Sequence, residues 1–218
     1  MTPFLVLAQP RSRTAWLSHF LTYGPWHCGH EEARHLRTLE DAQAWLSMPF
    51  TGSADTAVAP HWRTLIKLRP DVKIVTIRRP VEESIASFNR LPFNWDQEFL
   101  KRRIGSIDRK LDQIKARVAD VLEVQFHDLV REDVCASIFE RCLGVPHDSA
   151  RWNRLQGMNI QCDMRHISSY VTAHSAQIRK FSDHVRQDAI NDLNVAARGG
   201  PRRSTSADPD RRQPAVVE

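Results

Sequence analysis

The chain has 218 residues, of which 41% are apolar and 26% charged, as in an ordinary soluble globular domain whose core needs no disulfides. No apolar run approaches the roughly 18 residues of a membrane span, and the N-terminus lacks the long apolar segment of a signal peptide. The formal net charge of +5 is too small to indicate a nucleic-acid partner by itself, and it suits an anionic small ligand equally well.

The first elements of the chain predict an anion site. Residues 4–8 form a short apolar run typical of a buried strand, and a helical pattern with an apolar face starts at about residue 14. The polar turn between them contains Arg11, Ser12, Arg13 and Thr14. A helix N-terminus presents free N–H groups and a positive dipole end to this turn, and arginine can bind phosphate with two parallel hydrogen bonds. The anion is therefore expected to be a phosphate.

The rest of the first half continues as alternating helices and strands. Residues 26–35 are dense in polar side chains and carry no clear element. Thr38 predicts the N-cap of a helix that runs to about Ser47. A short strand is expected at 50–53, with Asp55 just past its end, followed by a helix at 57–69.

The middle of the chain repeats this alternation. The predicted strands are residues 71–77 and 121–126, and the predicted helices are 81–90, 96–119 (broken or bent near Gly105) and 133–143. Alternating strands and helices are typical of an α/β protein with a mainly parallel sheet flanked by helices.

The C-terminal part is expected to be helical, with helices at about 151–155 and 169–193. From Arg198 the chain is rich in Arg, Ser, Asp and Pro and almost free of apolar residues, which predicts a disordered tail. The expected organisation is one domain over 1–197 and a tail over 198–218. The cysteines (Cys28, Cys135, Cys142 and Cys162) show no paired spacing, which favours reduced thiols and a cytoplasmic protein.

The turn after the first strand is no Walker A loop, because no glycine occurs between residues 1 and 23. It resembles the 5′-phosphosulfate loop of the P-loop sulfotransferases, and especially the form found in a bacterial and phage-associated branch of that family. The residues that fit the pattern are Pro10, Arg11, Ser12, Thr14 and Trp16.

A second motif follows the strand at 71–77. Sulfotransferases bind the 3′-phosphate of their donor with an arginine at such a strand end and a serine eight positions later, and Arg79 and Ser87 resemble that pair. Looser similarity at 121–129, where His127 replaces the usual acid, and at 142–146 extends the resemblance over about residues 3 to 148. The C-terminal glycine-rich phosphate loop of many members has no clear counterpart, although 198–203 is basic and contains glycine.

The resemblance implies transfer of a sulfuryl group from 3′-phosphoadenosine 5′-phosphosulfate to a hydroxyl or amine acceptor, with no metal. Arg11 would neutralise the leaving 5′-phosphate, and Ser12 and Thr14 would donate hydrogen bonds. Arg13, where other branches have glycine, would reach the sulfonate or the acceptor. Trp16 would pack against the adenine or lie in the core.

The acceptor needs a general base. Many members use a histidine after the second strand, which is absent near 51–55; other members use a glutamate after the first helix, so Glu31 is favoured and Asp55 is second. A zinc site is not indicated, because His30 and His35 in H-E-x-x-x-H are spaced one residue too far apart to share a helix face.

Two alternatives remain open. The chain could be a nucleotide- or nucleic-acid-binding module without catalysis, or a small-molecule kinase, although neither Gly-Lys-Ser/Thr nor an obvious magnesium-binding acid accompanies the loop. The expected partner is a small-molecule or glycan acceptor. A nucleic-acid partner is not expected, and the oligomeric state is not indicated.

Overall fold

A computed structural model describes residues 1–32, 36 and 38–160, all within the compact unit Met1–Cys162. Its centre is a five-stranded sheet in the order β2-β3-β1-β4-β5, in which every neighbouring pair is parallel. The strands are β1 (Phe4–Ala8), β2 (His27–His30), β3 (Thr51–Asp55), β4 (Lys73–Arg78) and β5 (Val121–Gln125). The α/β fold class with a mainly parallel sheet is confirmed.

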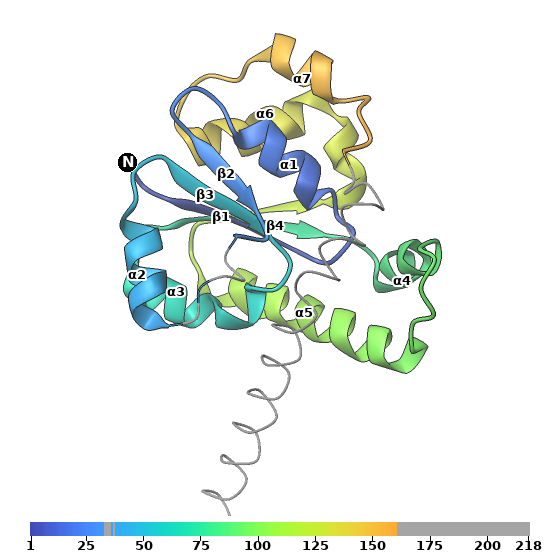
Figure 1. Ribbon diagram of the computed structural model, residues 1–218. Coiled ribbons are helices and arrows are strands. Elements are labelled where there is room, and N and C mark those ends of the chain that lie inside the picture. Colours follow the sequence, from blue (N-terminus) through green and yellow to red (C-terminus); the bar gives the residue numbers. More distant parts are fainter. Residues whose placement is uncertain (33–35, 37, 161–218) are drawn as a thin grey trace, which may run out of the picture. The chain divides into compact units, whose positions relative to one another are not determined.

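Helices cover both faces of the sheet. They are α1 (Thr14–Leu21), α2 (Leu39–Ser47), α3 (Trp62–Leu68), α4 (Val81–Asn89), α5 (Gln97–Arg117), α6 (Glu132–Leu143) and α7 (Ser149–Leu155), with short 3₁₀ turns η2 (Ala59–His61) and η3 (Phe126–Val130). In Figure 1, α1 and α6 lie on one face, α2, α3 and α5 lie on the other, and α4 stands beyond the end of β4. Among the described residues, none of these helices is long and apolar enough to cross a membrane.

The continuous apolar run of β1 reflects burial on both faces. Phe4, Val6 and Ala8 belong to the core beneath α1 and α6, whereas Leu5 and Leu7 belong to the core beneath α2, α3 and α5. Successive side chains of a strand point to opposite faces, so only an apolar residue at every position suits a strand covered on both sides.

Most predicted elements are present with small shifts at their ends, and three differences have physical causes. Strand β2 was missed, because its sequence His-Cys-Gly-His at the sheet edge has no apolar alternation. Helix α5 is continuous through Gly105, so the expectation of a break there is wrong, while a bend stays a prediction. The buried stripe on both sides of Gly105 outweighs a glycine cost of about 1 kcal/mol. The helix expected at 57–69 is divided, with Pro60 in the 3₁₀ turn η2. The helix expected at 169–193 and the tail at 198–218 lie outside the described residues.

Gly52 generates a stability prediction. It pairs with Phe4 across β3 and β1, and a Cβ at this position would meet the Phe4 ring at 2.2 Å. Phe4 is fully buried and packs against Trp26, so it has little room to move. We expect Gly52→Ala to lower the free energy of unfolding by about 1–3 kcal/mol, measured by urea denaturation. Gly157→Ala is the matched control, because a Cβ there meets nothing within 4 Å; equal stability of the two variants would contradict the packing.

Candidate functional site

The loop between β1 and α1 has an unusual backbone. Arg11 and Arg13 adopt left-handed conformations, with φ angles of 67° and 60°, although neither is glycine. Such conformations cost of order 1–3 kcal/mol each and concentrate at functional sites. The loop lies at the carboxyl end of β1, where ligands of open α/β sheets bind.

The loop contains hydroxyl groups suited to an anion. Ser12 is fully buried, and its Oγ has no hydrogen-bond partner among the described residues. Thr14 begins α1, and its Oγ1 lies 3.1 Å from His30 Nε2 at the end of β2. The N-cap residue Arg13 makes no side-chain capping bond, so no side chain at that position occupies the first amides of the helix. A buried hydroxyl and an uncapped helix N-terminus favour an anionic ligand.

The two motifs recognised in the sequence meet in space. Arg11 Nε donates to Ser87 Oγ at 3.1 Å, and the Arg79 guanidinium donates to the Arg11 carbonyl oxygen. The Arg79 guanidinium also lies 4.0 Å from the centre of the Phe126 ring and 3.6 Å from Glu83. Burial lowers the pKa of Arg79. Glu83 raises this pKa, whereas the positive charge of Arg11 lowers it further. Arg11 is therefore linked both to Ser87, through its side chain, and to Arg79, through its carbonyl oxygen.

His127, which departs from the family pattern, contacts the same cluster. Its Nε2 lies 2.9 Å from Glu83 Oε1, and this hydrogen bond is the main reason that the pKa of Glu83 is lowered. Glu83 thus bridges His127 and Arg79 on the face of α4 that carries Ser87, one turn further along the helix.

Arg13 and Trp16 extend away from this cluster. The Arg13 guanidinium donates to the carbonyl oxygens of Leu129 (3.4 Å) and Gln156 (3.3 Å) and stacks 4.5 Å from the Trp16 ring. Trp16 is 1% exposed in the core, and its Nε1 donates to the Leu155 carbonyl oxygen at 2.8 Å. These contacts join α1 to η3 and α7, which is a supporting arrangement; a contact of either residue with a ligand stays a prediction.

The predicted bases lie at the ends of β2 and β3. Glu31 is 5% exposed and left-handed (φ 57°), and its Oε1 accepts hydrogen bonds from the Thr56 amide (3.0 Å) and hydroxyl (2.6 Å). Asp55 is fully buried, and its Oδ1 accepts from the amides of Ala57 (2.7 Å) and Val58 (2.9 Å), as a turn cap does.

His30 is a further candidate for the base. In the sequence it was considered only as a possible metal ligand. It is exposed at the end of β2 and contacts the loop through Thr14. His30 directly precedes Glu31 in the sequence, which could have indicated its role. It was missed because β2 was not predicted as a strand, so His30 was not known to lie at a strand end. Within the described residues no group of His, Cys, Asp or Glu side chains could hold a metal ion, and His35 lies outside them.

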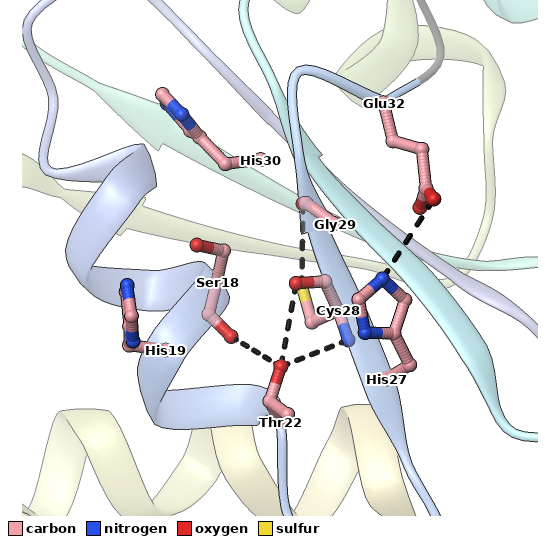
Figure 2. A pocket seen from close by; sticks show the side chains of 8 residues that line it. All are labelled: Ser18, His19, Thr22, His27, Cys28, Gly29, His30 and Glu32. Atoms are coloured by element: carbon pink, nitrogen blue, oxygen red, sulfur yellow. Dashed lines mark hydrogen bonds and ion pairs between the residues drawn. The ribbon is translucent and has the colours of Figure 1, made fainter. Parts of the chain in front are cut away.

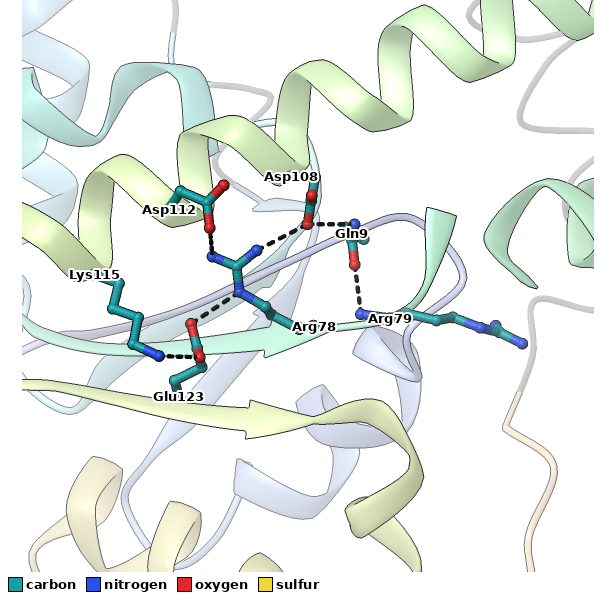
Figure 3. A network of polar contacts seen from close by, with 7 residues as sticks. All are labelled: Gln9, Arg78, Arg79, Asp108, Asp112, Lys115 and Glu123. Carbon is teal, nitrogen blue, oxygen red and sulfur yellow. Dashed lines mark hydrogen bonds and ion pairs between the residues drawn. The ribbon is translucent and has the colours of Figure 1, made fainter. Parts of the chain in front are cut away.

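A polar network supports the cluster from the other side of the sheet (Figure 3). Arg78 donates to Glu123 (2.9 Å), Asp108 (2.9 Å) and Asp112 (2.5 Å). Burial lowers the pKa of Arg78, but the three carboxylates outweigh this and raise it. Arg78 is thus neutralised, whereas its neighbour Arg79 extends in the opposite direction.

Gln9 joins this network to the cluster. It is fully buried, its Nε2 donates to Asp108 Oδ1 at 2.9 Å, and its Oε1 accepts the backbone N–H of Arg79. Since Gln9 directly precedes the loop, one side-chain amide ties the end of β1 to the end of β4. Sequence reasoning missed the role of Gln9, because a single polar residue after a strand has no distinguishing pattern.

Comparisons with known proteins bear on the fold and the family of the chain. Mouse sulfotransferase SULT7A1, solved in complex with PAP, has a similar structure, with a TM-score of 0.51 at 13% sequence identity. The similarity covers 71% of this chain and 63% of that chain, so the chain spans less than two thirds of the solved protein. No curated protein sequence is significantly similar to the chain.

The sequence itself matches the family model of the sulfotransferase domain over residues 24–195. This match begins after the loop at residues 9–13, so the resemblance of the loop is evidence independent of it. It includes both Arg79 and Ser87 and most of the chain, and it shows that the chain belongs to the sulfotransferase domain family.

Proposed function

We propose that the chain transfers a sulfuryl group from 3′-phosphoadenosine 5′-phosphosulfate to a hydroxyl or amine group of a small-molecule acceptor. The observation that carries the proposal is the meeting of Arg11, Arg79 and Ser87, beside the buried and unpartnered hydroxyl of Ser12. Membership of the sulfotransferase domain family and the fold shared with a PAP-bound enzyme support the same activity.

The two phosphate groups of the nucleotide would have separate partners. The 5′ side would lie on the loop and the N-terminus of α1, with Ser12 and Thr14, while the 3′ side would lie on Arg79 and Ser87. Arg11 starts in the loop but reaches Ser87, so its guanidinium could serve both ends. Arginine suits this task because its rigid fork matches phosphate oxygens.

The reaction forms a bond between the acceptor oxygen and sulfur and breaks the bond between sulfur and the oxygen of the 5′-phosphate. The electron pair of the broken bond stays on the leaving phosphate, where positive charge and N–H groups stabilise it. The proton of the acceptor hydroxyl passes to a base, for which Glu31 is the first candidate. Asp55 is the second candidate from the sequence, and His30 is a further one from the structure.

A kinase is the second candidate function, since phosphoryl transfer makes similar demands on the loop. Asp55 stands at the end of β3 beside β1, but its Oδ1 caps the following turn. Magnesium-dependent transfer from ATP would identify a kinase, and nucleotide binding without any transfer would identify a binding module.

Nucleotide affinities test the proposed donor site. Adenosine 3′,5′-bisphosphate, the product left after transfer, should bind roughly ten- to over a hundredfold more tightly than adenosine 5′-monophosphate, because a charged hydrogen bond typically contributes about 1.5–3 kcal/mol. Arg79→Ala should remove most of this preference, whereas Arg11→Ala should weaken both nucleotides. Arg102→Ala, an exposed residue on α5, is the charge-matched control. Calorimetry that finds equal affinities in the wild type would contradict the assignment.

The base is tested by turnover. Glu31→Gln should lower kcat by about two to four orders of magnitude while the affinity for adenosine 3′,5′-bisphosphate stays similar. The Gln side chain retains an oxygen that can accept from Thr56, so the local structure should persist. If kcat is unchanged in Glu31→Gln and falls in His30→Gln, the role belongs to His30.

Gln9 generates a prediction about preorganisation. Gln9→Met keeps the shape of the side chain but removes both hydrogen bonds that connect Asp108 with the Arg79 backbone. The affinity for adenosine 3′,5′-bisphosphate should fall about tenfold, while that for the monophosphate should change less. Asp112→Asn is the control, because Asp112 contacts Arg78 but not Gln9. An unchanged ratio of the two affinities in Gln9→Met would show that the amide does not position Arg79.

A further inference from the structure

We propose that the acceptor binds in the cavity between α1 and β2, and that it is a neutral, polyhydroxylated molecule of the carbohydrate type. The cavity has a volume of about 480 Å³, within the usual range for small-molecule sites. The residues that line it are Ser18, His19, Thr22, His27, Cys28, Gly29, His30 and Glu32 (Figure 2). This inference rests on the proposed function.

The order of strands indicates on which side the acceptor stands. Along the carboxyl edge of the sheet, β4 brings Arg79, β1 brings the loop, and β3 and β2 follow. With the 3′-phosphate at Arg79 and the 5′-phosphate on the loop, the nucleoside occupies the β4 side. The sulfuryl group, attached to the far side of the 5′-phosphate, then points toward β3 and β2. An in-line nucleophile must approach from that direction.

The cavity opens at the matching place. His30 lines it and also lies 3.1 Å from Thr14 Oγ1, the first residue of α1. One imidazole therefore connects the cavity to the loop that would hold the sulfuryl donor. From this end the cavity extends along α1 past Ser18 and His19 toward His27 (Figure 2).

The wall beside β2 is well ordered by hydrogen bonds. Cys28 N–H donates to Thr22 Oγ1 at 3.1 Å, and the Thr22 hydroxyl contacts the carbonyl oxygens of Ser18 (2.8 Å) and Cys28 (3.3 Å). This hydroxyl occupies the outer edge of β2 at Cys28, where an added strand would otherwise pair. The cavity beside this edge is therefore better suited to a small ligand than to the addition of another strand.

The chemistry of the lining indicates the class of acceptor. Among the described residues, the side chains that line the cavity include three imidazoles and one carboxylate, and none is aliphatic, phenyl or indole. The hydroxyls of Ser18 and Thr22 also line it, but they are already bonded to backbone groups. His27 and Glu32 form a pair at 3.7 Å near the mouth, with side-chain exposures of 64% and 35%. Such groups donate to and accept from hydroxyls, whereas a phenol or sterol needs apolar walls. Glu32 is the one carboxylate among the described lining residues, and its negative charge disfavours an acceptor that is already anionic.

The test uses the full chain with adenosine 3′,5′-bisphosphate bound. N-acetylglucosamine, galactose and 4-nitrophenol are titrated while the imidazole ring signals of the protein are followed by NMR, and transfer from labelled donor to each compound is measured. We expect a sugar to shift the signals of His27 and His30 and to accept the label. His27→Ala should raise the KM for that sugar about three- to tenfold with little change in kcat or nucleotide affinity. His19→Trp should raise KM by filling the cavity.

His61→Ala is the matched control, since His61 is an exposed histidine on η2 outside the cavity. If sugars are sulfated but KM is unaffected by both cavity variants, the proposed site is wrong while the proposed function stands. If no sugar binds, or only 4-nitrophenol is sulfated, the proposed acceptor class is wrong. If adenosine 3′,5′-bisphosphate itself does not bind, the proposed function fails, and that failure is visible before any acceptor is added.

Discussion

The amide of Gln9 joins the two strand ends on which the candidate site depends. Its oxygen accepts the backbone N–H of Arg79 and its nitrogen donates to Asp108, so it ties the end of β1 to both β4 and α5. The loop that follows Gln9 contains two left-handed arginines, a conformation that persists only when surrounding contacts hold it. The Arg79 guanidinium supplies one such contact at the Arg11 carbonyl oxygen, and the Arg13 contacts with η3 and α7 supply another.

The alternation of side chains at the end of β4 separates two arginines by function. Arg78 faces three carboxylates, which neutralise its charge. Arg79 instead faces the loop, where the positive charge of Arg11 repels it. Glu83 offsets part of that repulsion and is itself held by His127. Arg11 and Arg79 thus place two guanidinium groups near the loop, with Glu83 beside one of them, and guanidinium groups suit an anion with more than one phosphate.

The parallel sheet also orders the proposed reaction in space. The proposed nucleotide contacts lie at β4 and β1, while the candidate bases and the polar cavity lie at β3 and β2. A linear transfer needs such an arrangement, because the leaving phosphate and the attacking oxygen must stand on opposite sides of the sulfur. Since all strands run in the same direction, their carboxyl ends lie at one edge and can contribute to one site.

The sequence alone was sufficient for the features that depend on local pattern. The buried run of β1, the helix N-terminus at Thr14 and the capped helix α2 were all predicted, because burial periodicity and caps depend on neighbouring residues. The two motifs assigned to phosphate were likewise found in neighbouring residues, and their role in binding stays a prediction. Two motifs separated by about seventy residues could be expected to meet because both follow parallel strands.

Other features were decided only by the tertiary structure. Edge strand β2 has no apolar alternation and forms because β3 offers it hydrogen-bond partners. The formation of β2 places His30 and the cavity beside α1 next to the loop. Likewise Gln9 and Asp108, ninety-nine positions apart, carry no sequence signal for their contact, since a single hydrogen bond between distant polar residues leaves no periodic trace.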